Sequence, residues 1–489
     1  MTGKRSASPE IAVIDLSDPL GLTLTCRELD AGASAFAQDL SRRELSPGGA
    51  IGLIGDNSAK YLMAYMGVMR AGHVAVPINH RQPRSIIEYI CHEAGLALVL
   101  VDRNCSELVP PGVEFALLES PEFSVNASAD PFRMHVPEPT QTAQILFTSG
   151  STGQPKGVVL SHRSQITMLE NVCQGTGSAL FEGRRGIVAA PLFHMNGLFF
   201  STGVIAHGGA VVMMPRFEAT SFISAIDKYR VNVITGIPTM IVLMCRASEA
   251  LAKADLSCVE MVYIGSAPVT KAIVDMARAM MPGARILNSY GTTETGGALF
   301  GNHPQGLERP VLSVGYPMRH VELRLVDGED SSSGILEVKA PSNMTCYLNL
   351  PEKTAERVKD GWISTGDRFR IDERGFYFFD GRADDMFVCN GENVYPAPLE
   401  AILETAPGIA QVCVVPVEDV QRGAIPIAYV VAKPGASVTE GGLKDHALAR
   451  APAYMHPRRI FLVDSLPLSA TGKVNRQQLI ANATAALRI

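Results

Sequence analysis

The apolar positions along the chain predict two kinds of alternating element. Apolar runs rich in Val, Ile and Leu occupy 50–55, 74–78 and 97–101, and amphipathic stretches at 59–70 and 85–94 separate them. The alternation resumes with apolar runs at 187–190, 209–214, 233–237 and 259–264 and amphipathic stretches at 221–229 and 271–280. Continuous apolar strands joined by helices predict parallel β-sheets covered by helices on both faces. The fold class is therefore α/β.

The pattern changes after Val311 to shorter segments separated by turn residues. Segments at 321–326, 335–340 and 375–379, with a polar turn at 327–334, predict the hairpins of a small antiparallel subdomain. A polar, glycine-containing stretch follows at 380–385, and a compact α+β pattern then runs to the end. We expect a large N-terminal domain of parallel-rich αβα sheets at 1–380, whose antiparallel subdomain covers 311–380. A hinge at 381–384 then leads to a small mobile α+β domain at 385–489.

Composition narrows the class of protein. The chain has 489 residues, of which 46% are hydrophobic and 19% charged. These values are typical of a folded protein with roughly two to four domains and exclude a disordered chain. Lys and Arg number 43 and Asp and Glu 49, which gives a net charge of −6. The chain therefore lacks the basic excess expected of a nucleic-acid-binding protein, and any anion site must be local.

The cysteines and the apolar segments bear on the compartment. None of the nine cysteines forms a C-x-x-C pair, which favours reduced thiols and argues against a zinc cluster. The N-terminus lacks the apolar stretch of a secretory signal. The most apolar segment, 198–214, is interrupted by Ser201, Thr202 and His207 and falls short of the roughly 20 apolar residues of a membrane span. We expect this segment to be buried core and the protein to be cytoplasmic, without a membrane span.

The stretch from 145 to 162 contains the most informative local chemistry. Two apolar β-runs flank a loop dense in Ser, Thr and Gly, and glycines let backbone N–H groups approach a phosphate while hydroxyls and a lysine add donors. It is not a Walker A loop, because Gly157 and a strand follow Lys156. A flexible hairpin tip is the alternative. As a triphosphate cradle, the loop would use Thr148, Ser149, Gly150, Ser151, Thr152, Gly153 and Lys156.

The stretch 148–157 resembles the phosphate-loop signature of the adenylate-forming superfamily of acyl-CoA synthetases, peptide-synthetase adenylation domains and beetle luciferases. Further stretches are similar to the superfamily's motifs in the superfamily's order. They are Tyr290-Gly291-Thr292-Thr293-Glu294, Ser364-Thr365-Gly366-Asp367, Asp380-Gly381-Arg382-Ala383-Asp384-Asp385, Asn390-Gly391-Glu392-Asn393-Val394-Tyr395-Pro396 and Ser469-Ala470-Thr471-Gly472-Lys473-Val474. The resemblance covers essentially the whole chain.

The resemblance implies a reaction in which a carboxylate attacks the α-phosphate of ATP, so the site must neutralise two anions. Mg²⁺ takes one or two carboxylates together with phosphate oxygens, and Glu294 is the matching catalytic and metal-binding residue. Thr293 would offer a hydroxyl to the adenylate phosphate, and Tyr290 a flat face to the adenine. The remaining ATP-binding residues of this stretch are Ser289, Gly291 and Thr292.

Two further residues would hold the ribose, and one would act in catalysis. Asp367 can accept hydrogen bonds from the ribose hydroxyls, and Arg382 resembles the superfamily's arginine that reaches ribose and phosphate. Lys473 would bridge the attacking carboxylate and the α-phosphate as their charge redistributes. Taken alone, Asp367 and Arg382 could form an ordinary ion pair, and Lys473 could be a surface lysine.

The resemblance also implies a second half-reaction, in which coenzyme A (CoA) takes up the acyl group. A glycine at 391 allows close approach of a pantetheine arm, and Asn390 before it tolerates a left-handed backbone. The small domain would swivel about Asp384 between the half-reactions. The candidate CoA-binding residues are Gly391, Glu392, Tyr454, His456, Arg458 and Arg81.

The acyl group would bind between two stretches similar to the superfamily's pocket walls. His194 would flank the adenylated carboxyl group, although it could also be a structural histidine. Asn196 offers one hydrogen bond to the acid. Space beside its carboxyl group is suggested by the small residues Gly265, Ser266, Gly296 and Gly297. Together they favour an aryl or short substituted acid over a long fatty acid. The candidate residues are His194, Met195, Asn196, Gly265, Ser266, Ala267, Gly296 and Gly297.

The resemblance therefore predicts an ATP-dependent acid–CoA ligase, with ATP, a carboxylic acid and CoA as substrates and Mg²⁺ as cofactor. A homodimer is one candidate assembly. Four alternatives stay open: a medium- or long-chain fatty acyl-CoA synthetase, an acyl-adenylate transferase to a separate carrier protein, a non-catalytic nucleotide-binding homologue and, less favoured, a luciferase. No carrier domain is expected after Lys473, and the C-terminus is not the Ser-Lys-Leu peroxisomal signal. Ala340 and Cys346-Tyr347 stand where relatives often have glycines, and we expect them to affect packing of the subdomain more than the chemistry.

Overall fold

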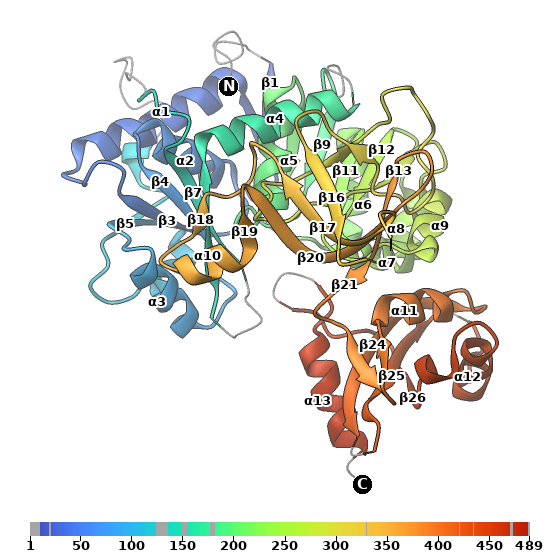
Figure 1. The fold of residues 1–489 in the computed structure, drawn as a ribbon. Coiled ribbons are helices and arrows are strands. Elements are labelled where there is room, and N and C mark those ends of the chain that lie inside the picture. Colours follow the sequence, from blue (N-terminus) through green and yellow to red (C-terminus); the bar gives the residue numbers. More distant parts are fainter. Residues whose placement is uncertain are drawn as a thin grey trace.

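The structure is a computed structural model that describes residues 10–18, 21–123, 135–148, 154–176, 181–328, 330–419, 421–433, 435–469 and 473–487. Figure 1 shows a large domain and, beyond the end of β21, a smaller C-terminal domain. Two largely parallel sheets, an antiparallel sheet and the helices around them form the large domain.

The first large sheet has seven strands within the described residues. It is parallel except at the pairs β7–β8 and β8–β18. Its order is β18 (Cys346–Tyr347), β8 (Lys156–Ser161), β7 (Thr142–Thr148), β4 (Val74–Ile78), β3 (Ala50–Ile54), β5 (Leu98–Val101) and β6 (Phe115–Leu117). The accompanying helices are α1 (Cys26–Arg42), α2 (Ala59–Arg70), α3 (Arg84–Glu93), α4 (His162–Thr176), η1 (Arg103–Leu108) and η2 (Pro121–Phe123).

The second large sheet also has seven strands within the described residues and is parallel except at β1–β2. Its order is β13 (Arg285–Asn288), β12 (Met261–Ile264), β11 (Val233–Gly236), β9 (Arg185–Val188), β10 (Ala210–Met213), β1 (Ile11–Asp15) and β2 (Leu22–Thr25). The helices that connect these strands are α5 (Met195–Ala206), α6 (Ala219–Tyr229), α7 (Pro238–Arg246), α8 (Ser248–Lys253) and α9 (Lys271–Met280).

One apolar core joins the two sheets. Buried residues of α1 and α2, among them Phe36 and Leu62, belong to one cluster with Ile51 of the first sheet and Val211 of the second. Burial of a side chain as large as Phe36 contributes about 2 to 3 kcal/mol. The α/β expectation from the alternating pattern is confirmed, and the segment 198–214 is buried in α5 and β10 as expected.

The antiparallel subdomain follows the two large sheets. Its main sheet has the order β16 (Glu322–Val326), β17 (Ser333–Lys339), β20 (Trp362–Ile371) and β19 (Val358–Lys359), with β21 (Tyr377–Arg382) on β20. β14 (Phe300–Gly301) pairs with β15 (Tyr316–Pro317), and α10 (Pro351–Arg357) precedes β19. Because β20 pairs with β21 in the register Asp367–Arg382, two of the candidate ribose-binding residues are neighbours in one sheet.

The small domain packs helices against a mixed sheet. The strands are β22 (Phe387–Cys389), β23 (Glu392–Val394), β24 (Ile409–Asp419), β25 (Gly423–Ala432) and β26 (Arg459–Leu462). The helices are α11 (Pro396–Glu404), α12 (Glu440–Leu448), η3 (Ala453–Met455) and α13 (Arg476–Leu487). Apolar side chains from both groups, such as Leu399, Val430 and Leu443, form its core.

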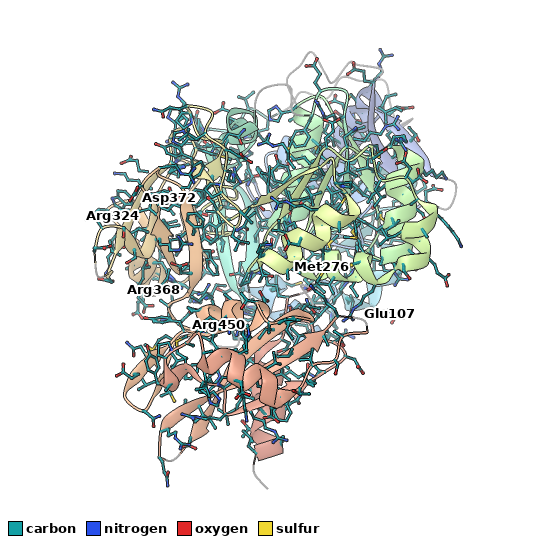
Figure 2. The ribbon with its side chains drawn as sticks, turned by 90° about the vertical axis from the view of Figure 1, so that its right-hand side faces the viewer. Glu107, Met276, Arg324, Arg368, Asp372 and Arg450 are labelled. Carbon is teal, nitrogen blue, oxygen red and sulfur yellow. The ribbon has the colours of Figure 1, made fainter. Side chains whose placement is uncertain are left out.

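The two domains touch along one side of the large domain. Met276 of α9 packs against the apolar cluster of the small domain, and Figure 2 shows Met276 where the two domains meet. Arg246 at the end of α7 donates a hydrogen bond to the carbonyl oxygen of Asp464 at 3.2 Å. These contacts define the orientation of the small domain relative to the large one.

Candidate active site

A large cleft lies between the domains, with a volume of about 2070 Å³. Its walls come from both parallel sheets, the antiparallel subdomain and the small domain. Most of the motifs singled out in the sequence meet here. The candidate residues that line it are Arg81, Thr148, Lys156, His194, Met195, Asn196, Ser266, Ala267, Ser289, Tyr290, Gly291, Thr292, Thr293, Glu294, Gly297, Asp367, Arg382, Asp384 and Lys473. Ser149, Gly150, Ser151, Thr152 and Gly153 lie outside the described residues.

Glu294 sits on a turn that hydrogen bonds hold in shape. The Thr292 backbone N–H donates to Thr295 Oγ1 at 3.1 Å, and the Thr295 N–H donates back to Thr292 Oγ1 at 3.2 Å. The Tyr347 hydroxyl donates to Glu294 Oε1 at 2.9 Å. The Lys156 ammonium lies 5.4 Å from the centre of the Tyr347 ring. Tyr347 therefore links the acidic turn to the end of the phosphate-loop hairpin.

Tyr347 both packs in the core and contacts the candidate site. Its side chain is buried in the cluster that joins the two large sheets, as the expectation about packing requires, and its hydroxyl also bonds to the candidate metal-binding carboxylate. Burial raises the pKa of Tyr347, as does the neighbouring Glu294 carboxylate. The phenol therefore stays protonated and remains a hydrogen-bond donor.

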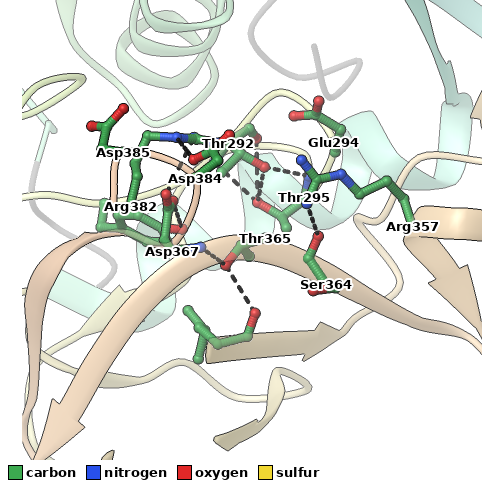
Figure 3. A network of polar contacts seen from close by, with 12 residues as sticks. Thr292, Glu294, Thr295, Arg357, Ser364, Thr365, Asp367, Arg382, Asp384 and Asp385 are labelled. Atoms are coloured by element: carbon green, nitrogen blue, oxygen red, sulfur yellow. Dashed lines mark hydrogen bonds and ion pairs between the residues drawn. The ribbon is translucent and has the colours of Figure 1, made fainter. Parts of the chain in front are cut away.

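The Asp367 carboxylate forms a second charged group in the cleft, shown in Figure 3. Asp367 is buried on β20, accepts a hydrogen bond from the Tyr290 hydroxyl at 2.5 Å and lies 3.2 Å from the Arg382 guanidinium. Arg382 also pairs with both carboxylate oxygens of Asp384, at 2.8 and 2.9 Å. Burial raises the pKa of Asp367, and the Arg382 charge opposes that shift.

The Tyr290 ring is partly enclosed by other aromatic side chains. Its centre lies 4.7 Å from that of Phe369 and 6.1 Å from that of Phe300. The ring is thus fixed by packing and its hydroxyl by Asp367. A stacking contact with adenine at this ring stays a prediction.

Lys473 reaches the cleft from the small domain. The walls of the cleft desolvate its ammonium and lower its pKa, and the Arg382 charge adds to the shift. The Asp367 and Glu294 carboxylates oppose the shift. The turn that bears Lys473 is closed at its base, where the Asn475 N–H donates to the carbonyl oxygen of Pro467 at 2.8 Å and the Ser469 N–H donates to that of Lys473 at 2.7 Å. The lysine from one domain and the acidic turn from the other therefore face the same space.

His194 stands at the N-terminus of α5 and is enclosed by the protein. Burial lowers its pKa to about 4, with smaller contributions from Lys473 and Arg81, so the imidazole is neutral near pH 7. Its ring centre lies 4.8 Å from that of Phe193. Its Nε2 is buried and has no hydrogen-bond partner among the described residues. A buried polar atom of this kind, at the edge of the cleft, is free to bind a ligand.

Asn57 fixes the loop that leads to His194. Its amide nitrogen donates to the carbonyl oxygens of Ala190 and Met214 at 2.9 and 3.1 Å, and its amide oxygen accepts from the Leu192 N–H at 2.7 Å. These three bonds tie the loop after β9 to the loops after β3 and β10. No sequence motif pointed to Asn57. Its signal was weak: a polar residue after an apolar strand, the usual position of polar residues at the carboxyl edge of a parallel sheet.

In the part of the cleft expected to bind the acyl group, the structure differs in part from the predicted open space beside the carboxyl group of the acid. Asn196 lines the cleft, and its Oδ1 accepts a hydrogen bond from Thr235 at 3.0 Å. The small size of Gly265 and Gly296 reflects close backbone packing instead of open space. A Cβ at Gly265 would lie 2.3 Å from Ser289 Oγ, and one at Gly296 would lie 2.1 Å from the Ser342 carbonyl oxygen. The open space inferred from these two glycines is therefore a wrong expectation.

The candidate CoA-binding residues of the small domain gather away from the cleft walls. Asn390 and Gly391 both adopt left-handed conformations, with φ of 55° and 84°, in the turn between β22 and β23. β23 lies beside η3, which contains Tyr454. Among the described residues, the buried Nε of Arg458 has no hydrogen-bond partner. Gly391, Glu392, Tyr454, His456 and Arg458 are absent from the lining of the cleft, whereas Arg81 is part of it.

Arg357 is a further residue that sequence reasoning missed. It lies at the end of α10, lines the cleft and donates to the carbonyl oxygen of Ser364 at 3.2 Å. Figure 3 shows its guanidinium on the same side of the site as Glu294. Its local sequence, an ordinary helix end, carries no signal for a ligand site.

The Glu294 carboxylate fits Mg²⁺ bound together with ATP. Mg²⁺ usually keeps several waters and takes one or two carboxylates plus phosphate oxygens, so a single oriented carboxylate is a sufficient protein contribution. The described residues contain no group of three or more His, Cys, Asp or Glu side chains arranged around one metal position.

No helix in the described part of the chain combines the length and apolarity needed to cross a bilayer.

Comparison with known proteins adds independent information. A family model described as AMP-binding enzyme matches residues 4–348, and one described as AMP-binding enzyme C-terminal domain matches residues 398–473. The chain is 31% identical to fatty acid–[acyl-carrier-protein] ligase ScoC of Streptomyces coeruleorubidus, over 94% of the chain and 91% of that protein. It is also 31% identical to peroxisomal OPC-8:0-CoA ligase 1 of Arabidopsis thaliana, over 97% and 91%. The crystal structure of ATP-bound MatB from Rhodopseudomonas palustris superposes with a TM-score of 0.87 at 26% identity, over 99% of this chain and 97% of that one.

Proposed function

Because the chain belongs to the AMP-binding, adenylate-forming superfamily, we propose that it is an ATP-dependent acid–CoA ligase that works through an acyl-adenylate. One observation carries the proposal: Lys473 of the small domain faces the same cleft as Glu294 and Asp367 of the large domain. The ammonium of Lys473 thus lies in the same cleft as the carboxylates of Glu294 and Asp367, which would hold the metal ion and the ribose.

In the first half-reaction, an oxygen of the substrate carboxylate attacks the α-phosphorus of ATP and pyrophosphate leaves. The Lys473 ammonium neutralises the two anionic groups as they approach, and its effect is greater in a cleft that excludes water. When bound, Mg²⁺ neutralises phosphate charge. Glu294, oriented by Tyr347, is the residue that would hold it.

Asp367 and Arg382 would orient the nucleoside. The Asp367 carboxylate is fixed by Tyr290 on one side and Arg382 on the other, so it can accept the ribose hydroxyls in one orientation. Thr148, Lys156 and the hydroxyl-bearing residues 292–293 line the neighbouring part of the cleft, which supports a position for the phosphates between them.

The substrate we propose is an aryl or short substituted acid. The neutral imidazole of His194 lies at the cleft edge, and Asn196, held by Thr235, keeps its amide nitrogen available for a polar group of the acid. The hydrogen bond from Thr235 fixes the orientation of that amide. A site built to hydrogen-bond a substrate discriminates strongly against analogues that lack the bonding group.

In the second half-reaction, the CoA thiol attacks the acyl carbon and AMP leaves. Gly391, Glu392, Tyr454, His456 and Arg458 lie away from the cleft in this orientation, and rotation of the small domain about Asp384 would bring their face to it. Arg458, whose Nε is buried and unpaired among the described residues, is suited to a CoA phosphate. Arg81 would contribute from the large domain.

A carrier-protein pantetheine is the second candidate acceptor. The name of the ScoC relative, an acyl-carrier-protein ligase, favours it, whereas the name of the Arabidopsis relative favours CoA. The pantetheine arm is common to both acceptors, so Gly391 could serve either.

A panel of acids tests the proposal. Pyrophosphate release should depend on both ATP and one class among aryl, branched, hydroxylated and fatty acids, and adding CoA should yield the matching thioester. Release without thioester formation, restored by a pantetheine-bearing carrier protein, would favour the carrier alternative. If no acid supports pyrophosphate release, the ligase proposal fails.

A further inference from the structure

Arg476 connects three parts of the small domain next to the candidate catalytic lysine. It follows Lys473 by three residues and is the first residue of α13. Its Nη1 donates to the carbonyl oxygen of Val414 on β24 at 2.6 Å, and its Nη2 donates to Glu400 Oε1 on α11 at 2.8 Å. Its Nε lies 4.0 Å from Oδ2 of Asp385, the residue that directly follows the proposed hinge residue Asp384.

The contacts of Arg476 with α11 and β24 are rigid. The Glu400 side chain is only 10% exposed, and its Oε1 also accepts a hydrogen bond from the Val414 N–H at 2.7 Å. One carboxylate oxygen and one strand carbonyl therefore hold the guanidinium from two sides. A charged hydrogen-bonded pair that is this enclosed keeps a single geometry better than an exposed one.

The contact with Asp385 links Arg476, and through it α11 and β24, to the hinge. The neighbouring carboxylate of Asp384 is already bound to Arg382 of the large domain. Figure 3 shows the Asp385 carboxylate pointing away from that pair. Asp384 is hydrogen-bonded to Arg382, whereas the Asp385 carboxylate lies 4.0 Å from Arg476 of the small domain and also helps to raise the pKa of Arg382.

We propose that Arg476 is a positioning residue that joins the Asp385 end of the hinge to the turn bearing Lys473, so that hinge rotation is transmitted to the lysine. The inference rests on the proposed function, in which Lys473 serves adenylate formation. Without this connection the small domain would still fold, but the lysine turn would move relative to the hinge. A displacement of about 1 Å at a reacting group can cost as much as a hundredfold in rate.

Asp385 gives the cleanest test because it lies outside the Glu400 and Val414 contacts. Asp385→Asn should lower kcat of pyrophosphate release about tenfold while KM for ATP changes less than about twofold. Thioester formation from supplied acyl-adenylate should keep its wild-type rate. Asp385→Glu, which keeps the charge, should recover most of the lost kcat. Arg459→Ala, which removes an exposed arginine paired with Glu440 in the same domain, is the control and should change neither rate.

A measurement without substrate separates this inference from the proposed function. Amide hydrogen exchange at 473–479 should be faster in Asp385→Asn than in the wild type, while exchange in β24 and β25 is unchanged. Unaltered exchange at 473–479, or an equal loss of both half-reactions, would overturn the role of Arg476. Absence of pyrophosphate release in the wild-type protein would instead overturn the ligase proposal. In that case the hydrogen-exchange result alone would test whether Arg476 joins Asp385 to the turn bearing Lys473.

Discussion

At the scale of single residues, uncharged neighbours help to orient the functional groups of the cleft. Glu294 takes its position from the Tyr347 hydroxyl, Asp367 from the Tyr290 hydroxyl, and the His194 loop from the amide of Asn57. The two tyrosine hydroxyls donate to the carboxylates and the Asn57 amide oxygen accepts from the Leu192 N–H, and all three groups stay neutral near pH 7. Asp367 has the Arg382 guanidinium as an additional, charged neighbour.

The Tyr347–Glu294 hydrogen bond leads to a prediction. Tyr347→Phe removes the donor without changing the size of the ring, so we expect kcat of pyrophosphate release to fall several-fold and the Mg²⁺ concentration for half-maximal rate to rise. A hydrogen bond to a charged group contributes about 1.5 to 3 kcal/mol, roughly tenfold or more if it is used fully in the transition state.

Tyr316→Phe is the matched control, because Tyr316 is not among the described residues that line the cleft and its ring packs against His303. If Tyr347→Phe and Tyr316→Phe have the same Mg²⁺ dependence as the wild type, the link between Tyr347 and metal binding is refuted.

The sequence could point to candidate residues where a motif is local, but not to partners that are distant along the chain. Glu294, Asp367 and Lys473 stood in recognisable short motifs, and the cleft brings them together. Tyr347 lies 53 residues from Glu294 and Asn57 135 residues from Leu192, so no local pattern could pair them. The glycines misled for another reason: a small side chain marks either open space or close backbone packing, and the sequence does not distinguish the two.

At the scale of elements, the helices and strands that the sequence predicted followed from periodicity, whereas α1, α4 and α7 were not among them. The expected strand at 74–78 and helices at 59–70 and 271–280 have the same bounds in β4, α2 and α9, because each combines a strong pattern with turn residues at its ends. The sheet order was not predictable. It depends on which strands pair across long connections, as in β9 between β10 and β11.

The hydrogen bond between Glu404, the last residue of α11, and Thr270, the N-cap of α9, makes one carboxyl group sensitive to domain orientation. Burial raises the pKa of Glu404 to about 8, opposed by a hydrogen bond with Thr270 at the N-terminus of α9, and Glu400 adds to the rise. When the domains separate, Glu404 should return toward its ordinary pKa. The docked state then binds a proton that the separated state lacks, so docking weakens as pH rises from about 4.5 to 8 and changes little above pH 8.

Glu404→Gln mimics the neutral carboxyl group and should remove this pH dependence. We expect fluorescence energy transfer between dyes on the two domains to fall between pH 6 and pH 8.5 in the wild type but to stay constant in the variant. A fall of equal size in both proteins would show that another group controls docking.

At the scale of the whole molecule, the structure presents one orientation of the small domain. Lys473 faces the cleft, whereas Gly391 and Arg458 do not. In the proposed mechanism, this orientation is the one for adenylate formation, and thioester formation would follow a rotation of the small domain. The existence of a separate small domain was predictable from the change in pattern after the polar 380–385 stretch. Its orientation was not, because it depends on contacts such as Met276 and Arg246 with the small domain.

The rotation predicts unequal effects of substitutions at Asp384. Asp384→Pro restricts the backbone at the hinge, so we expect thioester formation from supplied adenylate to fall far more than pyrophosphate release. Asp384→Ala, which loses the same ion pair with Arg382 but keeps a free backbone, is the control and should retain most of the thioester rate. An equal loss of both half-reactions in Asp384→Pro alone would count against a hinge at this position.

The most direct test of a shared cleft is the effect of Lys473→Ala on the two half-reactions, measured separately with an acid that the wild-type protein activates. If the ammonium neutralises the approaching anions, pyrophosphate release should fall at least about a hundredfold, while thioester formation from supplied acyl-adenylate should stay within about twofold of the wild-type rate. Pyrophosphate release at the wild-type rate would contradict the account, because the lysine and the acidic turn would then share the cleft without sharing the chemistry.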